Sequence, residues 1–314
     1  YSIKDIKFYQ KKINKNCKVV HRINECDERK NTNGLNKFFV ESNKCADRTI
    51  FVSQWLQDLY EKEGLYNNNL VIMSGSNSEI FNPKDKATWE KNSKLKIVTH
   101  HWGNNWNKGF DLYLELDNLL DQKKYSEKIQ FTYIGNLPKN FEFRNAYHIE
   151  PTHGIELAEL LKNNHIYITA SKNEPSGNHH IEASQCGLPV LYLNSGGIPE
   201  FCNGYGLMFE ENNFEKKLNE IINNYKNYEQ KMSSYPFNSE KMCKEYLDLF
   251  LDMKKNEEKI LEERTAELNY LLYSKFIFQI KRKLNKYVNK SKFLKSILTL
   301  LNRIYLKLKS IIVK

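Results

Sequence analysis

Short runs of β-branched and other apolar residues recur along the chain, and most are followed by a stretch whose apolar residues are spaced as on a helix. The runs predict strands at residues 17–23, 49–53, 70–74, 95–100, 129–135, 146–150, 165–170 and 188–194. The helical spacing covers residues 35–45, 54–63, 110–120, 155–163 and 178–186. Because strand and helix alternate almost throughout, the pattern predicts parallel sheets with right-handed crossover helices, an α/β architecture.

A turn-rich stretch at residues 75–94 separates the expected strands into a group of three and a group of five. A complete doubly wound domain has about five or six strands, so the first group is expected to be truncated. We therefore predict a partial N-terminal Rossmann-like unit over residues 1–82 and a second Rossmann-like unit over residues 83–235. The chain opens with Tyr1 and not with Met, which indicates processing or a fragment of a longer protein.

The chain ends in helical patterns. Residues 213–227 and 239–255 are predicted helices, the second within a separate segment at 236–256, and residues 257–314 form a helical tail. In the tail Lys and Arg lie mostly on other faces, whereas one face collects the apolar residues Phe293, Ile297, Leu300, Leu301, Ile304, Leu308 and Ile311. Such a basic amphipathic helix can lie on an anionic membrane surface. The alternative is a helix that buries the same stripe against a protein partner.

The net charge of +10 is concentrated in the tail. Residues 275–314 contain ten Lys, two Arg and no acidic residue, so the rest of the chain sums to −2. Because the body is nearly neutral and carries no recognition motif, nucleic-acid binding is not expected. We instead expect residues 275–314 to be the part that meets an anionic membrane surface.

The composition, 40% apolar and 13% aromatic, suits a globular protein. The six cysteines contain no C-x-x-C pair, which favours reduced thiols. No run reaches the roughly 20 apolar residues that span a bilayer, and the sequence shows no signal peptide. These features predict a cytoplasmic protein that is peripheral on the inner face of the membrane if its tail binds lipid.

Three junctions between expected strands and helices of the second unit have unusual contents. In parallel α/β sheets, ligands bind at the carboxyl ends of the strands. The first junction places Lys108 and Gly109 directly before a helix, where an ammonium group and free backbone N–H groups suit a phosphate. A solvated lysine at a helix start is the plainer interpretation of this junction alone.

The second junction, SKNEPSG, delivers Glu174, and Gly177 and Asn178 open the helix that carries Glu182. Proline and glycine before the first turn let a ligand approach the backbone closely. Glu182 can accept two hydrogen bonds from a ribose diol, and Glu174 can accept hydrogen bonds from sugar hydroxyls. A diphosphate would then lie over the helix N-terminus, although two glutamates eight residues apart are common by chance.

The third junction contains Gly196 and Gly197, whose turn would allow close contact with phosphate or sugar. In the first unit, the segment HRINECDERKNT, which begins at His21, directly follows strand residues and is expected to form a loop that faces the interdomain cleft. There His21 is a candidate for contact with a transferred sugar, and Arg22 or Arg29 for contact with phosphate or acceptor. A charged surface loop is the alternative. His21 and a nearby cysteine are too few ligands for a metal site.

These motifs together carry a resemblance to a known family. The run EPSGNHHIEASQCGLPVLYLNSGGIPEF resembles the signature of family 4 glycosyltransferases of the GT-B fold: Glu, seven residues, Glu, an Ala/Ser-rich helix, Gly-x-Pro-Val and Gly-Gly-x-Pro-Glu. Weaker similarity extends over about residues 17–250, where NKGFDLYLEL looks like the phosphate loop and VIMSGSNSEIFNP like the interdomain linker. Residues 239–253 are similar to the closing helix that returns to the N-terminal domain.

The resemblance implies roles for particular residues. Glu174 would contact the donor sugar, Glu182 the nucleoside ribose and Lys108 the diphosphate, while Gly177 would lend backbone N–H groups. Family members transfer sugar with retention of configuration and usually need no metal or other cofactor, and this chain has no Asp-x-Asp motif.

Two departures from the family pattern concern the phosphate site and the loop. His100 and His101 stand where the family usually has Gly-Arg, and a histidine could replace the arginine only when protonated. Ser176 replaces a common phenylalanine.

The resulting hypothesis is a retaining glycosyltransferase that moves a sugar from a nucleotide-diphosphate donor to a glycan or lipid-linked acceptor. The alternatives are a donor-binding module or inactive fragment of a GT-B protein, and a GT-B-fold sugar-nucleotide epimerase or phosphorylase.

Overall fold

The computed structural model describes residues 3–66, 68–90, 92–264, 300 and 303. The chain divides into two units, one formed by residues 1–18 and 249–314 and the other by residues 19–248. The amphipathic tail predicted from residue 275 onward lies outside the described residues, apart from positions 300 and 303. Its membrane-binding role therefore stays a prediction.

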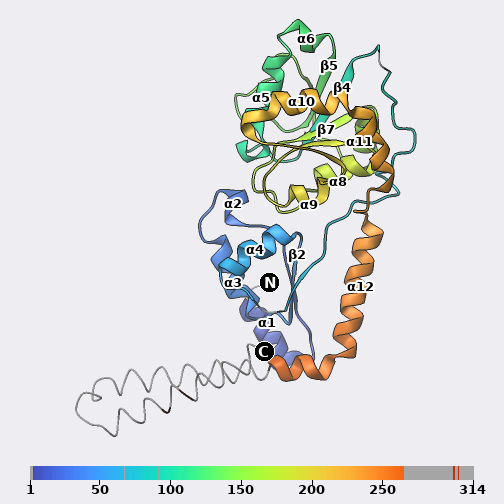
Figure 1. The fold of residues 1–314 in the computed structure, drawn as a ribbon. Helices are drawn as coiled ribbons and strands as arrows, with labels where there is room; N and C mark the ends of the chain where they lie inside the picture. The colour runs from blue at the N-terminus through green and yellow to red at the C-terminus, as the bar shows by residue number, and fades with distance from the viewer. Residues whose placement is uncertain (1–2, 67, 91, 265–299, 301–302, 304–314) are drawn as a thin grey trace, which may run out of the picture. The chain divides into compact units, whose positions relative to one another are not determined.

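Two parallel sheets lie within residues 19–248 (Figure 1). The smaller has the order β1-β2-β3 and comprises β1 (Val20–Ile23), β2 (Arg48–Phe51) and β3 (Asn69–Val71). Its helices are α2 (Asp27–Lys30), α3 (Leu35–Asn43) and α4 (Gln54–Lys62). The core of this part is built by Ile23, Phe51, Leu56 and Tyr60, all fully buried.

The larger sheet has the order β6-β5-β4-β7-β8-β9, with all pairs parallel. Its strands are β4 (Leu95–His101), β5 (Ile129–Gly135), β6 (Tyr147–Ile149), β7 (Ile166–Thr169), β8 (Val190–Leu193) and β9 (Gly206–Phe209). The predicted α/β class with two Rossmann-like parallel sheets is confirmed.

Strand β9 was not predicted. It is a short edge strand whose only buried residue is Phe209, and its apolar run, Leu207 to Phe209, is only three residues long and follows a glycine. A side chain at Gly206 would place its Cβ 2.0 Å from the Val190 carbonyl oxygen, which explains the glycine in a strand position.

Helices cover both faces of the larger sheet (Figure 1). Successive residues of a strand point to opposite faces, and on β4 Ile97 and Val98 accordingly enter different apolar clusters. The Ile97 cluster includes residues of α5 (Phe110–Leu119), α6 (Lys123–Ser126), α10 (Phe214–Asn223) and α11 (Tyr225–Lys231). The Val98 cluster includes residues of α7 (Gly154–Lys162), α8 (Asn178–Gln185) and α9 (Ile198–Cys202). Short turns of 3-10 helix span Trp106–Lys108, Glu211–Asn213 and Met232–Ser234.

Helix α12 (Ser239–Lys255) begins where residues 75–76 lie against residues 238–239. The Ser239 N–H donates to the Ser76 carbonyl at 2.8 Å, and the Asn238 side chain accepts from the Lys241 N–H at 2.8 Å, so Asn238 caps the helix. A Cβ on Gly75 would lie 2.1 Å from the Asn238 carbonyl oxygen. Glycine at position 75 therefore permits this close approach.

The unit formed by residues 1–18 and 249–314 contains α1 (Ile3–Phe8), a π-helical turn (Tyr9–Ile13) and the end of α12. Arg264 donates to the carbonyls of Lys15 at 3.1 Å and Cys17 at 2.9 Å, and Lys18 pairs with Glu257. These contacts join its two chain segments. None of the helices in the described residues is long and apolar enough to cross a membrane.

Candidate functional site

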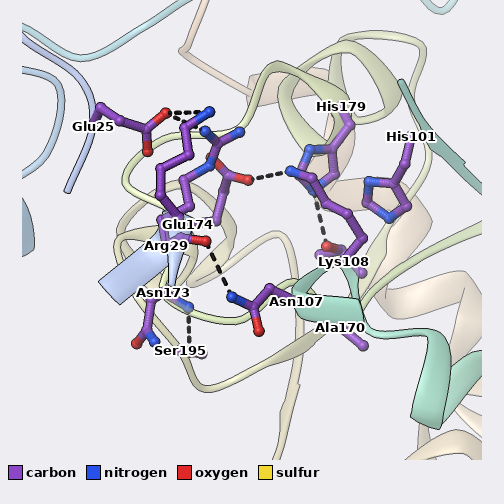
Figure 2. A network of polar contacts seen from close by, with 12 residues as sticks. Glu25, Arg29, His101, Asn107, Lys108, Ala170, Asn173, Glu174, His179 and Ser195 are labelled. Atoms are coloured by element: carbon purple, nitrogen blue, oxygen red, sulfur yellow. Dashed lines mark hydrogen bonds and ion pairs between the residues drawn. The ribbon is translucent and has the colours of Figure 1, made fainter. Parts of the chain in front are cut away.

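Glu174 is the centre of a buried ionic cluster at the carboxyl end of the larger sheet (Figure 2). Its Oε2 lies 2.7 Å from Lys108 Nζ and its Oε1 lies 2.8 Å from Arg29 Nε, while the residue is only 4% exposed. Burial by itself would raise the pKa of this carboxyl, but Lys108 and Arg29 outweigh burial and hold its pKa below 4.5. Glu174 is therefore an anion held between two cations.

Lys108 is positioned by the close approach of two loops. It ends the turn Trp106–Lys108, and Gly109 follows with φ +94° as the N-cap of α5. A Cβ on Gly109 would lie 2.4 Å from Ala170 Cβ and 2.6 Å from the Ala170 carbonyl oxygen. Only glycine fits here, so the Lys108–Gly109 pair predicted as a phosphate loop is packed directly against the end of β7.

Arg29 reaches the cluster from α2, beside the smaller sheet. Asp27, at the start of this helix, accepts hydrogen bonds from the Thr32 hydroxyl and from the backbone N–H groups of residues 34, 35 and 36. Burial is outweighed by these bonds, which lower the pKa of Asp27 to about 2. Arg29 also pairs with Glu25 at 2.5 Å. The turn thus fixes the element from which Arg29 points at Glu174.

Two asparagines attach this turn to loops of the larger sheet. The Asn107 side chain donates to the Arg29 carbonyl at 3.1 Å, and the Asn173 side chain donates to the Glu28 carbonyl at 3.4 Å. Figure 2 shows the Asn107 side chain directed at the backbone of Arg29. The residues that hold Arg29 in place thus come from the loops that carry Lys108 and Glu174.

Glu182 lies on α8, where its Oε2 is 3.0 Å from His100 Nε2 at the end of β4. Glu182 and Glu174 thus have different partners and lie in different local environments. Their predicted contacts, of Glu182 with a ribose and of Glu174 with a sugar, stay predictions.

His101 is buried at the end of β4. It is 3% exposed, its Nε2 lies 2.7 Å from the Tyr113 hydroxyl, and its ring stacks on Tyr113. Burial, followed by the positive charge of Lys108, holds the pKa of His101 well below 6.5. This histidine is therefore neutral and does not replace the arginine that the family usually carries at the strand end.

The predicted glycines support the loop around Glu174. Gly177 has φ +68°, and a Cβ there would lie 2.8 Å from Glu174 Cγ. The Gly197 N–H donates to the Glu174 carbonyl at 2.9 Å, and a Cβ on Gly196 would lie 2.5 Å from the same oxygen. Asn178 begins α8. Ligand contacts of these residues stay predictions; their observed partners are protein atoms.

The two remaining candidates, His21 and Arg22, lie within strand β1 and not on a loop as predicted, and both have other partners. His21 Nδ1 lies 2.9 Å from Asn43 Oδ1, and Arg22 Nε donates to the Tyr246 hydroxyl of α12 at 3.1 Å. Burial lowers the pKa of His21 more than the Asn43 contact raises it. Of the three residues predicted in this loop, the contacts of the described residues bring only Arg29 to Glu174.

Sequence reasoning missed Glu200 at the start of α9. Its carboxylate accepts the N–H groups of Gln54 and Trp55, each at 2.7 Å, at the N-terminus of α4. A carboxylate in this position is favoured by the unpaired N–H groups and the helix dipole. The Pro199-Glu200 pair was visible as a helix start, but its partner helix is about 145 residues away.

An open pocket lies beside the Glu174 loop at the ends of β7, β8 and β9. It is lined by polar residues, among them Lys172, Asn173, Asn194, Ser195 and Glu210. Among the described residues no group of three His, Cys, Asp or Glu side chains is placed to hold a metal ion. Metal independence stays a prediction.

Two parallel sheets, with a lysine and a glutamate facing each other at the carboxyl edge of the larger one, define a protein of the GT-B fold. The chain belongs to the family described as glycosyl transferases group 1, whose model matches residues 81–238. This match covers the whole larger sheet and the junctions that carry Lys108, Glu174 and Glu182.

Two curated relatives are subunits of phosphatidylinositol N-acetylglucosaminyltransferase. The gpi3 subunit of Schizosaccharomyces pombe is 23% identical over 64% of this chain and 45% of the relative. The GPI3 subunit of Saccharomyces cerevisiae is 28% identical over 53% of this chain and 37% of the relative. The chain thus matches less than half the length of either relative.

Solved structures share the fold. Anabaena HepE in complex with UDP-glucose superimposes with a TM-score of 0.62 at 14% identity, over 80% of this chain and 77% of HepE. TarM superimposes with a TM-score of 0.58 at 17% identity, over 76% of this chain and 51% of TarM.

Proposed function

We propose that the chain transfers a sugar from a nucleotide-diphosphate donor to a glycan or lipid-linked acceptor with retention of configuration. The observation that carries the proposal is the Lys108–Glu174 pair at the carboxyl edge of the larger sheet. Membership of the glycosyl transferase family and the UDP-glucose bound to the similar fold of HepE support it.

The donor would lie across the three junctions. Its ribose would hydrogen-bond with Glu182, its diphosphate would lie over the start of α8 beside Lys108, and its sugar would face Glu174. Helix N-termini carry partial positive charge and unpaired N–H groups. A buried ammonium at the same place stabilises the negative charge that develops on a departing diphosphate.

In the reaction, the bond between the anomeric carbon and the diphosphate oxygen breaks, and the acceptor hydroxyl oxygen bonds to that carbon. The proton of the acceptor hydroxyl is taken up by the leaving diphosphate, so charge and atoms balance without a metal. His21 is proposed to contact the transferred sugar from the smaller sheet. The function of both curated relatives in transferring N-acetylglucosamine to phosphatidylinositol, as their names state, supports a lipid-linked acceptor.

The test is binding followed by transfer. Saturable binding of a UDP- or GDP-sugar is expected by calorimetry, and Glu182→Ala should weaken it by about tenfold or more, because a charged hydrogen-bond acceptor is lost. Glu159→Ala, an exposed glutamate on α7, is the matched control. The proposal fails if no nucleotide sugar binds, or if both variants bind like the unmodified chain.

A second candidate, a donor-binding module without transfer, is favoured by the three strands of the smaller sheet among the described residues. Mass spectrometry of acceptor mixtures separates the two. A donor that binds and is never consumed, with every acceptor class offered, supports the module.

We also propose that the chain acts at the inner face of a membrane. Its basic residues 275–314 support this location. Co-sedimentation with phosphatidylserine vesicles, but not with phosphatidylcholine vesicles, is expected; equal binding to both, or to neither, contradicts it.

A further inference from the structure

The cluster around Glu174 holds more positive than negative charge. Among the described residues, the ion pairs of this cluster join three cations, Arg29, Lys30 and Lys108, to two carboxylates, Glu25 and Glu174, so one positive charge is in excess. Lys108 and Arg29 both direct a nitrogen at a carboxylate that is 4% exposed. Two cations converging on one buried anion form a site that a further anion would complete.

Both cations keep hydrogen-bond donors for such an anion. An ammonium has three N–H groups and a guanidinium has five. Lys108 directs its ammonium at Glu174, and Arg29 uses Nε for Glu174 and Nη1 for Glu25. Within the described residues Nη2 of Arg29 makes no hydrogen bond or ion pair, so one arm of the guanidinium fork remains for a ligand.

The diphosphate of a nucleotide sugar carries two negative charges, whereas in the described part of the chain the loops of the larger sheet bring one cation, Lys108, into an ion pair with Glu174. Its strand-end residue His101 is buried against Tyr113. We propose that Arg29 is the second diphosphate-binding cation and replaces the arginine that is absent from the end of β4. This inference rests on the proposed function of the same site.

The attachment of α2 explains how Arg29, which lies beside the smaller sheet, can contact a nucleotide sugar bound at the larger sheet. Asn107, next to Lys108, holds the Arg29 carbonyl, and Asn173, next to Glu174, contacts the Glu28 carbonyl. The loops that carry Lys108 and Glu174 therefore also hold the helix that carries Arg29. An arginine suits this task because its planar fork binds phosphate in a fixed orientation.

The test uses the full chain and compares ligands that differ in one phosphate. Binding of UDP, UMP, GDP, GMP and inorganic pyrophosphate is measured by calorimetry for the unmodified chain, Arg29→Ala, Arg29→Lys and the control Lys44→Ala. The Lys44→Ala substitution removes the same positive charge, but from an exposed ion pair with Glu41. We expect Arg29→Ala to weaken binding of pyrophosphate and the diphosphates by about ten- to a hundredfold, with a much smaller effect on the monophosphates. Arg29→Lys should restore part of the loss.

The outcomes separate the inference from the proposed function. Pyrophosphate and diphosphates that bind Arg29→Ala as tightly as the unmodified chain overturn the role of Arg29. Equal loss for mono- and diphosphates also overturns it, because Arg29 would then only support the fold of the site. If the unmodified chain itself binds neither nucleotides nor pyrophosphate, the proposed function fails as well.

Discussion

The Nζ atom of Lys108 lies 2.7 Å from Oε2 of Glu174, and both side chains are largely buried. The pair joins the loop after β4 to the loop after β7, two neighbouring strands. A buried charge is costly without its partner, so each residue requires the other even without a ligand. This interdependence makes Glu174 the most informative position to change.

Glu174→Gln should separate nucleotide binding from sugar transfer. The variant keeps the shape of the side chain and loses its charge, so Lys108 and Arg29 gain freedom to bind phosphate. We expect transfer to fall by about a hundredfold or more, while the dissociation constant for pyrophosphate stays the same or decreases. Weaker pyrophosphate binding would show that Glu174 holds the cations in place for the ligand.

Glu174→Gln should also reduce folding stability, by about 3–5 kcal/mol, as expected when a buried ion pair loses one partner. Urea unfolding measures this. Glu211→Gln is the comparison, because its pair with Lys172 is exposed and should contribute under about 1 kcal/mol. Equal effects of the two substitutions would contradict the buried character of the cluster.

Gly109→Ala should be far more destabilising than Gly34→Ala. Both glycines have positive φ, +94° and +113°, but only at Gly109 would a Cβ collide, 2.4 Å from Ala170 Cβ. Gly34→Ala is expected to cost about 1–3 kcal/mol for backbone strain alone, and Gly109→Ala several kcal/mol more or a failure to fold. Similar unfolding free energies would mean that the loops can separate without cost.

Glu200→Ala should release the start of α4. The carboxylate holds the N–H groups of Gln54 and Trp55, and loss of a helix cap costs about 0.5–2 kcal/mol. Faster hydrogen exchange is expected at these two amides, with α3 unaffected. Unchanged exchange at both positions would show that water or Ser53 replaces the carboxylate.

His165 should make folding stability depend on pH. Burial, followed by the nearby Lys86 and Lys96, lowers the pKa of His165 to about 4 from 6.5, and its Nδ1 accepts the Lys96 N–H at 2.9 Å. Between pH 6.5 and about 4, His165 therefore binds a proton in the unfolded chain but not in the folded chain. The unfolding free energy should therefore fall as pH drops from 6.5 to about 4, by about 3 kcal/mol from this residue.

His165→Asn is the variant that checks the pH effect, since its amide oxygen can accept the same N–H without titrating. Unfolding at several pH values should show a smaller loss for the variant than for the unmodified chain. If the unfolding free energies of the two proteins change with pH in parallel, the prediction is wrong.

The central strands were predictable because they are rich in β-branched and aromatic residues, as in β4, β5 and β7. Lys108, Gly109 and Glu174 were found because a strand, a loop and a helix start follow one another within a few residues. Strand β9 was missed because its apolar run is only three residues long and follows a glycine.

Contacts between distant segments were less accessible to sequence reasoning. Nothing local indicates that Glu200 caps α4, or that Arg29 and not Arg22 meets Glu174. The neutral state of His101 depends on burial against Tyr113, which periodicity does not reveal. In each case the deciding partner comes from another loop or helix, brought near by the tertiary fold.

The hydrogen bonds around Asp27 have an entropic consequence for ligand binding. A long arginine side chain and a free loop would both lose mobility on meeting a ligand, and that loss weakens binding. Here the Asp27 carboxylate orders its turn during folding, and Glu25 already restrains the guanidinium. Much of the ordering is thus complete before any ligand arrives, so an anion entering the site meets groups already in place.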